Sequence, residues 1–238
     1  MHPINEKRIK FLKFLFIAFS IFIFFVITFL VSAITFYPGG NFINNLEHGY
    51  SFLYNTMCDL KGITAINGAS NLLSSVFIKT STILACISMI IFFSTIWVFF
   101  QNTKTMKYLS WIASLFGINF GPFYLAIIFI KTEYEFHMAF DAIAGLTLNI
   151  SVIMYTILYF MQKNIPLINR YTFLVLSISS ITYSIIVTTS TVLGGQFNLF
   201  VHRLGSNLFI IFSFGIFLFQ GIGLSFEKNK KYEAMIHI

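Results

Sequence analysis

Charged residues are scarce in this 238-residue chain, and cysteines and prolines are few. Asp, Glu, Lys and Arg make up only 10% of the sequence, with two cysteines and four prolines. The sequence has no phosphate-binding glycine loop and no nucleophile-elbow motif. Because 57% of the residues are hydrophobic, a water-exposed globule of this composition would aggregate. We therefore predict an integral membrane protein without a soluble domain.

Six apolar stretches are long enough to cross a bilayer as helices, which takes about 20 residues for roughly 30 Å of hydrocarbon. They cover residues 11–36, 80–100, 108–130, 136–161, 171–193 and 202–226. The first could be a signal peptide, but its apolar core exceeds the roughly 7–15 residues of such signals, so we predict an uncleaved span. The predicted fold class is all-α, a polytopic six-helix membrane bundle with an outer polar cap over residues 37–79.

The basic residues are unevenly distributed between the predicted loops. With both termini in the cytoplasm, eleven of the 15 fall on the cytoplasmic side: Lys7, Arg8, Lys10, Lys13, Lys104, Lys107, Lys163, Arg170, Lys228, Lys230 and Lys231. Short loops rich in Lys and Arg stay in the cytoplasm. The sequence therefore predicts a multi-pass protein of the cell membrane with cytoplasmic termini. Its net charge of +7 indicates contact with membrane lipids, anionic ones included, rather than nucleic acid.

The predicted cap begins where Tyr37-Pro38-Gly39-Gly40 ends the first span, since the proline disfavours helical geometry before it and the glycines favour a turn. We expect the cap to fold back over the outer ends of the fourth and sixth spans. The reason is that the cap contains apolar residues that gain free energy by burial against those spans. They are Phe42, Leu46, Phe52, Leu53 and Leu60. Cys58 in the cap and Cys86 in the second span are predicted at different depths, which argues against a disulfide.

Side chains capable of chemistry gather on the predicted outer face. His137 and Asp141 lie four residues apart on one face of the fourth span, and His202 and Arg203 open the sixth. An ionised side chain within hydrocarbon costs about 2.5–3.5 kcal/mol, so Asp141 needs a partner or a wet cavity. Two interpretations stay open. One is an ion pair between Asp141 and Arg203 that fixes helix register, and the other is a site that joins Asp59, His137, Asp141 and His202.

The second interpretation predicts a site with catalytic or metal-binding capacity. Zinc takes imidazole and carboxylate ligands, so His137, Asp141 and His202 are candidate ligands, although no HExxH or CxxC spacing accompanies them. Four further residues are assigned to the same pocket: Glu47, Asn55, Arg203 and Asn207. The predicted function is binding of a lipid or small solute in an outward-facing polar pocket. The alternative is a membrane-embedded, metal-dependent hydrolase acting on a lipid amide or ester.

The order YPGGN, NTMCDL and AINGASN ahead of a second span resembles an uncharacterised family of six-span membrane proteins of bacteria and archaea, a domain of unknown function. The resemblance covers roughly the first hundred residues, and the later spans mainly by topology. It implies the six-span architecture and no established activity. Members often carry a histidine at the start of late spans, which here corresponds to His137 and His202.

A second resemblance is to the membrane hydrolase superfamily of alkaline ceramidases and progestin-type receptors. In that superfamily a Glu, an Asn-Thr-x-Ser segment, an aspartate and three histidines build a zinc amidase site. Here Glu47 and Asn55-Thr56-Met57-Cys58 are similar to its first part. The chain departs from the pattern in three ways: Cys58 replaces the serine, six spans are predicted instead of seven, and His202 is followed by Ser206 instead of a second histidine.

Overall fold

The computed structural model describes residues 6–129, 134–193 and 196–227, without the side chains of residues 134–138, 190–193 and 196–199. Within this part the predicted all-α bundle is confirmed, because six helices are long and apolar enough to cross a membrane. They are α1 (Glu6–Thr35), α2 (Leu72–Ile96), α3 (Lys104–Phe129), α4 (Tyr134–Met161), α5 (Leu167–Leu193) and α6 (Gln196–Phe226). Two short 3-10 helices, η1 (Met57–Lys61) and η2 (Trp97–Phe100), lie in the cap and after α2.

The second helix starts earlier than its predicted span. Residues 72–79, assigned to the cap from the sequence, form the first turns of α2, so the non-helical cap covers residues 36–71. Ser75 Oγ donates a hydrogen bond to the carbonyl oxygen of Lys61 at 2.7 Å, and Ser74 is also buried. Such polar residues lower the mean hydropathy of this stretch. They are compatible with a helix here because Ser75 bonds to the cap and Ser74 is buried. The helix therefore continues beyond the segment that hydropathy identifies.

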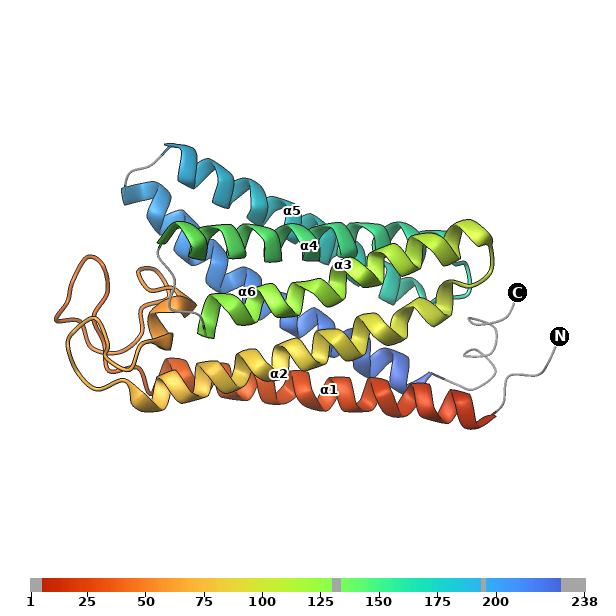
Figure 1. Ribbon diagram of the computed structural model, residues 1–238, viewed down its shortest axis with the longest axis horizontal. Coiled ribbons are helices and arrows are strands. Elements are labelled where there is room, and N and C mark those ends of the chain that lie inside the picture. The colour runs from red at the N-terminus through yellow and green to blue at the C-terminus, as the bar shows by residue number, and fades with distance from the viewer. Residues whose placement is uncertain (1–5, 130–133, 194–195, 228–238) are drawn as a thin grey trace.

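The helices form one bundle with the cap at one end (Figure 1). The first and last helices lie side by side, because Lys13 Nζ donates to the backbone oxygen of Glu227 at 2.5 Å and the rings of Phe19 and Phe217 meet edge to face at 6.4 Å. A Cβ on Gly221 would lie 2.4 Å from Ser20 Oγ, so only glycine allows α6 to approach α1 this closely. Helix α1 begins and α6 ends at the end opposite the cap (Figure 1).

Phenylalanine rings fill the centre of the bundle. Phe92 of α2 contacts Phe19 of α1 at 4.9 Å between ring centroids, Phe217 of α6 at 5.4 Å and Phe173 of α5 at 6.1 Å. Aromatic pairs at these separations add about 0.5–1.5 kcal/mol each beyond the area that they bury. One aromatic centre thus connects four helices.

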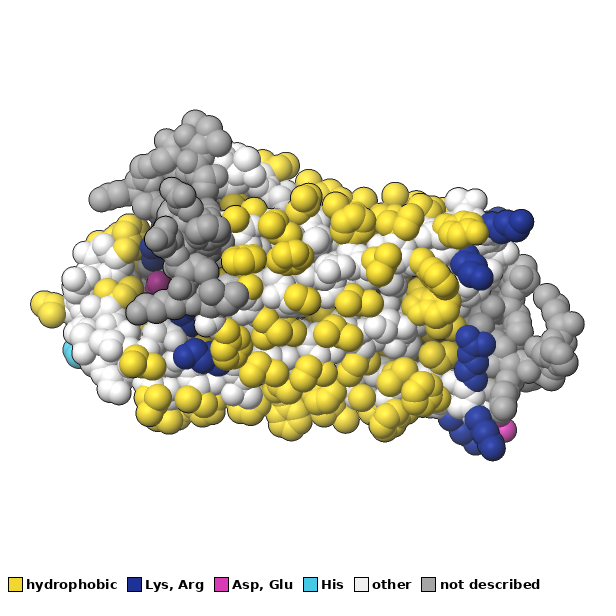
Figure 2. Space-filling view, viewed as in Figure 1, with side chains coloured by type: hydrophobic (Ala, Val, Ile, Leu, Met, Phe, Trp, Pro, Cys, Tyr) yellow, Lys and Arg dark blue, Asp and Glu magenta, His cyan; other side chains and the backbone are white. Residues whose placement is uncertain are grey.

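The outer surface of the bundle separates an apolar band from a basic end. Figure 2 shows hydrophobic side chains along the middle of the helices and Lys and Arg side chains at the end opposite the cap. An apolar band of this kind suits hydrocarbon, and the basic side chains at its edge suit lipid head groups. The chain is therefore a multi-pass membrane protein with chemically different ends.

Glycines and asparagines shape the cap. Gly39 and Gly40 adopt φ values of +131° and +83°, which L side chains rarely reach, and they start a turn in which Gly40 N donates to Glu47 O at 2.7 Å. Four buried or half-buried asparagine side chains then bond to the backbone across the cap: Asn41, Asn55, Asn67 and Asn71. The segments YPGGN, NTMCDL and AINGASN are thus parts of a single hydrogen-bonded structure.

The predicted burial of the cap's apolar residues is only partly correct. Leu60 is buried and Phe42 is half-buried, but Leu46 is 84% exposed and Phe52 and Leu53 also lie on the surface. Internal hydrogen bonds, rather than apolar burial, give the cap its shape, which explains the difference. The cap does pack against the bundle: Lys61 Nζ donates to Ile127 O of α3 at 3.1 Å, and several bonds described below join it to α6.

Candidate functional site

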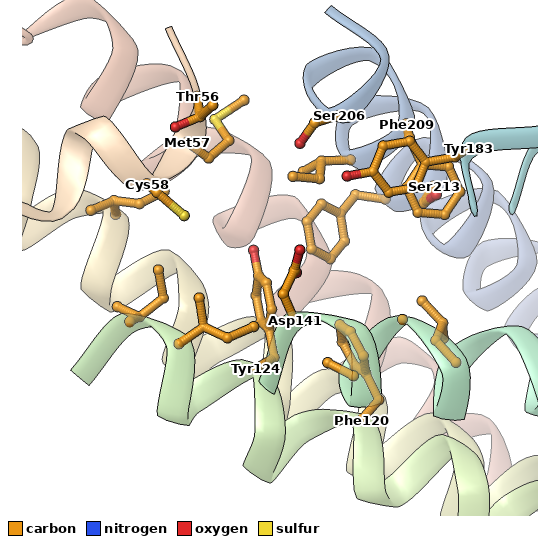
Figure 3. Close-up of a pocket in the computed structure, with 18 of the residues that line it drawn as sticks. Thr56, Met57, Cys58, Phe120, Tyr124, Asp141, Tyr183, Ser206, Phe209 and Ser213 are labelled. Carbon is orange, nitrogen blue, oxygen red and sulfur yellow. The ribbon is translucent and has the colours of Figure 1, made fainter. Parts of the chain in front are cut away.

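A cavity of about 390 Å³ lies beneath the cap, between the helices. Its floor and walls come from α2, α3, α4, α5 and α6, and η1 of the cap closes it (Figure 3). Such a volume lies within the ~300–1,000 Å³ of small-molecule sites, which also favour gaps between the helices of bundles. The cavity is therefore the principal candidate for a binding site in the described part of the chain.

The lining is mostly apolar, and most of its polar side chains lie toward the cap, with Ser213 deeper in the bundle. The apolar members include Met89, Phe120, Ile127, Leu148, Phe214 and Phe217. The polar members are Thr56, Cys58, Tyr124, Asp141, Tyr183, His202, Arg203, Ser206 and Ser213. This division matches an amphiphilic molecule, whose chain prefers the interior and whose head group prefers the polar end.

Asp141 projects from α4 into this cavity. Figure 3 shows its carboxylate next to the hydroxyl of Tyr124, with Cys58 on one side and Tyr183 on the other. Among the residues that the structure describes, no hydrogen bond or ion pair joins the Asp141 carboxylate to another group. A carboxylate at this depth therefore has its acceptor capacity directed into the cavity.

Two further polar atoms at the cavity wall lack a partner in the described chain. They are Nε2 of His202 and Oγ of Ser213, both on α6 and both buried. A buried polar atom without a hydrogen bond costs about 1–3 kcal/mol, so orphaned atoms that share one cavity are unusual in a purely structural region. Both atoms are buried within the cavity wall, whereas the Asp141 carboxylate projects into the cavity.

Cys58 contributes a thiol from η1, directed into the cavity (Figure 3). The pKa of this thiol is raised to about 11, chiefly by burial; Lys61 acts in the opposite direction, and the carboxylates of Asp141 and Asp59 add smaller upward contributions. A thiol with a raised pKa is a poor nucleophile near neutral pH. No disulfide joins Cys58 to Cys86, in agreement with the prediction from the sequence.

Arg203 pairs with the cap. Its guanidinium lies 3.6 Å from the Asp59 carboxylate, donates to the backbone oxygen of Tyr54 and sits 4.2 Å from the centre of the Phe42 ring. The predicted ion pair between Arg203 and Asp141 is therefore wrong. The cap brings Asp59 to the end of α6, and that carboxylate satisfies the arginine instead.

Asn207 joins α6 to the cap one turn further along. Its Nδ2 donates to the backbone oxygens of Phe52 and Asn55, and its Oδ1 accepts from the Tyr50 hydroxyl at 2.9 Å. Burial raises the pKa of Tyr50, with the nearby Asp59 carboxylate adding to the shift, so the phenol stays protonated as the donor. These bonds fix the cap over the cavity.

The predicted site residues thus separate into two groups. Asp141, His202 and Arg203 line the cavity. Asp59, Asn55 and Asn207 bond within the cap or between the cap and α6: Asn55 donates to Gly40 O at 2.9 Å, and Asp59 accepts from Thr56 N at 2.8 Å at the start of η1. Glu47 accepts from Asn41 within the cap and does not line the cavity.

His137 belongs to α4, but its side chain lies outside the described residues. In the part of the chain whose side chains are described, no three His, Cys, Asp or Glu side chains form a group that could hold a metal ion. The zinc site of His137, Asp141 and His202 therefore stays a prediction.

Several lining residues escaped the sequence reasoning, chiefly Tyr124, Tyr183 and Ser213. Tyrosines and serines within apolar spans are usually structural, which is why they attracted no attention. One signal was available on α6, where His202, Ser206 and Ser213 recur at spacings of four and seven residues and so share a helix face.

A second cavity, of about 370 Å³, lies between α4 and α5. It shares five lining residues with the first: Asp141, Gly145, Leu148, Tyr183 and Phe209. Its remaining wall carries a hydrogen-bonded group in which Asn149 donates to Ser184 Oγ at 2.5 Å and accepts from Ser180. Asp141 therefore stands where an apolar cavity and a more polar one meet.

Comparison of the chain with protein-family models, with curated proteins and with solved structures gave no significant match.

Proposed function

We propose that this membrane protein binds a single-chain amphiphile, a lipid or a lipid-like small molecule, in the cavity beneath the cap. The observation that supports this proposal is a mostly apolar cavity wall with a group of polar side chains toward the cap that includes Thr56, Asp141 and His202. The Asp141 carboxylate, which projects into the cavity, supplies hydrogen-bonding capacity that a head group can use.

The polar end decides which molecule binds. A hydrocarbon chain gains little by moving from lipid into the cavity, since lipid tails are as apolar as the cavity's own Leu and Phe side chains. Selectivity among amphiphiles then rests on hydrogen bonds and charge at the head group, where the surroundings hold little water and such interactions are strong. A few polar groups in a mainly apolar pocket are the usual arrangement in small-molecule sites.

The proposal includes an orientation in the cell membrane, with the cap outside and both termini in the cytoplasm. It is supported by the basic residues at the ends of the bundle. Lys7, Arg8, Lys10, Lys13, Lys104, Lys107, Lys163 and Arg170 lie at helix ends away from the cap, whereas Lys61, Lys79 and Arg203 lie at the cap end. The end with more Lys and Arg faces the cytoplasm and its anionic lipids.

The experiment that tests binding fills the cavity at Gly145. Gly145 lines the cavity and a Cβ added there meets no atom within 4 Å, so Gly145→Leu places a larger side chain at the cavity wall. Gly215→Leu is the matched control, because that glycine lies in α6, also has open space around it and does not line the cavity. The probe is dodecanol, and its binding to the purified protein is followed by native mass spectrometry.

Wild-type protein and Gly215→Leu should retain one dodecanol with similar affinity, and Gly145→Leu should lose most of that binding. The loss follows because the new side chain occupies the space of the bound chain. Failure of wild-type protein to retain dodecanol, or equal retention by all three proteins, would refute the proposal.

A further inference from the structure

We propose that the amphiphile carries a protonated amine and that Asp141 is its counter-ion. The inference rests on the proposed function and specifies the head group that the cavity accepts. It follows from the charges on the cavity wall, taken one by one.

Among the side chains that the structure describes, the charges facing the cavity do not balance. Arg203 is the lining residue with a permanent positive charge, and its guanidinium is already occupied by Asp59, the Tyr54 carbonyl and the Phe42 ring. Asp141 receives no hydrogen bond or ion pair from the described residues. Because the charges of Arg203 and Asp59 neutralise each other, the carboxylate of Asp141 is the remaining charge among the described side chains of the cavity. A ligand of opposite charge can therefore pair with it.

The remaining ionisable groups of the cavity do not supply a second fixed cation. Cys58, Tyr124 and Tyr183 are neutral when protonated, and the buried Nε2 of His202 has no partner in the described chain. An ionised carboxylate within hydrocarbon is costly unless a cation or several donors meet it. A primary ammonium supplies both a positive charge and three donors.

The position of Asp141 suits the end of an extended molecule. The carboxylate lies next to the hydroxyl of Tyr124 (Figure 3), and the same cavity is lined by the apolar side chains of Phe120, Leu148 and Phe217. An alkyl chain along these side chains places its terminal amine at Asp141. Because Asp141 also borders the second cavity, beside Asn149 and Ser184, a polar substituent near the amine has space of its own.

A fatty acid fits the same space but not the same charges. Its carboxylate would face Asp141, and like charges in a medium of low dielectric constant repel strongly. An alcohol of equal length is neutral and can donate a hydrogen bond to Asp141, yet it gains no attraction between full charges. The three head groups therefore give different affinities if Asp141 acts as a counter-ion.

The experiment compares dodecylamine, dodecanol and dodecanoate, which share one chain and differ in head group. Each is titrated at pH 7.4 into wild-type protein, and binding is read by native mass spectrometry. Dodecylamine should bind at least about tenfold more tightly than dodecanol, a difference of roughly 1.4 kcal/mol, and dodecanoate should bind most weakly. In Asp141→Asn the amine should lose its advantage, so that dodecylamine and dodecanol bind with similar affinity.

The controls separate this inference from the function on which it rests. Glu6→Gln removes an exposed acid paired with Lys10 at the opposite end of the bundle and should leave the amine preference intact. Asp141→Glu keeps the charge and should keep the preference, which covers the case in which Asp141→Asn does not fold. Equal binding of the amine and the alcohol by wild-type protein, or tighter binding of dodecanoate, would overturn the inference while leaving amphiphile binding in place. Absence of binding by all three probes would refute the proposed function itself.

Discussion

At the scale of single residues, the polar side chains near the cap differ in where their hydrogen bonds go. Asn55, Asn207 and Arg203 direct theirs into the protein and hold the cap on α6. His202 and Ser213 line the cavity and each has a buried polar atom without a partner among the described residues. The first group is expected to govern stability and the second to govern binding.

The sequence identified most of these residues as polar groups at one end of the bundle, but not their pairing. The sequence places His202 and Arg203 at the same depth, because they are consecutive residues of one helix. The partner of Arg203 depends on how residues 36–71 fold, and that depends on positive-φ glycines and asparagine bonds to distant backbone atoms. The fold of the cap brings Asp59 to Arg203, and no local sequence pattern indicates this ion pair.

Cys58 provides a test at this scale through its raised pKa of about 11. At pH 8 such a thiol is ionised to roughly 0.1%, against about a quarter for a thiol of ordinary pKa near 8.5. In a Cys86→Ser variant, alkylation of Cys58 by N-ethylmaleimide at pH 8 should therefore be at least about 100-fold slower than after denaturation. Mass spectrometry of the labelled protein measures the rate.

The pH dependence distinguishes a raised pKa from simple lack of access. Because the neutral thiol is favoured by burial, the thiolate fraction and the rate should rise about tenfold per pH unit up to pH 10 and level off only near pH 11. Restricted access alone would lower the rate at every pH without moving that point. A rate that levels off near pH 9 would contradict the assignment.

At the scale of elements, the six helices follow from hydropathy, whereas the cap does not. Long apolar stretches leave a chain in a bilayer no alternative to helices, since every backbone group needs a partner inside the segment. The sequence pattern is helical from Ala69, close to the start of α2 at Leu72, and the first turns of this helix, where Ser75 bonds to the cap, precede the span of residues 80–100 predicted to lie within lipid. Leu46 was expected to be buried but is exposed, because the cap takes its shape from hydrogen bonds and not from the burial of apolar side chains.

The glycine at the start of the cap offers a test of that element. A Cβ on Gly39 would lie 2.2 Å from the Glu47 carbonyl oxygen, and its φ of +131° suits only glycine. Gly39→Ala should therefore loosen the cap by at least about 2 kcal/mol, within the range for strained backbone positions. Hydrogen exchange of the peptide covering residues 37–55 should become more than about tenfold faster.

Gly49→Ala is the matched control for this change. Gly49 also has a positive φ, of +75°, but nothing lies within 4 Å of the Cβ that alanine would add. Its cost is limited to the left-handed backbone, about 1–2 kcal/mol. Equal exchange rates in the two variants would show that the close approach of Gly39 to Glu47 does not shape the cap.

At the scale of the whole molecule, the uneven charge of the two ends predicts a single orientation. Cysteines are introduced singly at Leu46, which is exposed on the cap, and at Lys104, which is exposed at the basic end, in a chain whose Cys58 and Cys86 are replaced by serine. A membrane-impermeant maleimide added to intact cells should label the Leu46→Cys protein alone. The Lys104→Cys protein should react only after permeabilisation, and the reverse pattern would invert the orientation.

The close packing of α1 against α6 has a consequence for how the protein is made. The ribosome produces α1 first and α6 last, so the surface around Phe19 and Ser20, which receives Phe217 and Gly221, stays without its partner until almost the whole chain has been synthesised. The cavity is equally incomplete until then, because His202, Arg203 and Ser213 arrive with the same helix. Assembly of the finished bundle is therefore a post-insertion event, and a nascent chain stalled before α6 would present an open, phenylalanine-lined groove to lipids and to membrane chaperones.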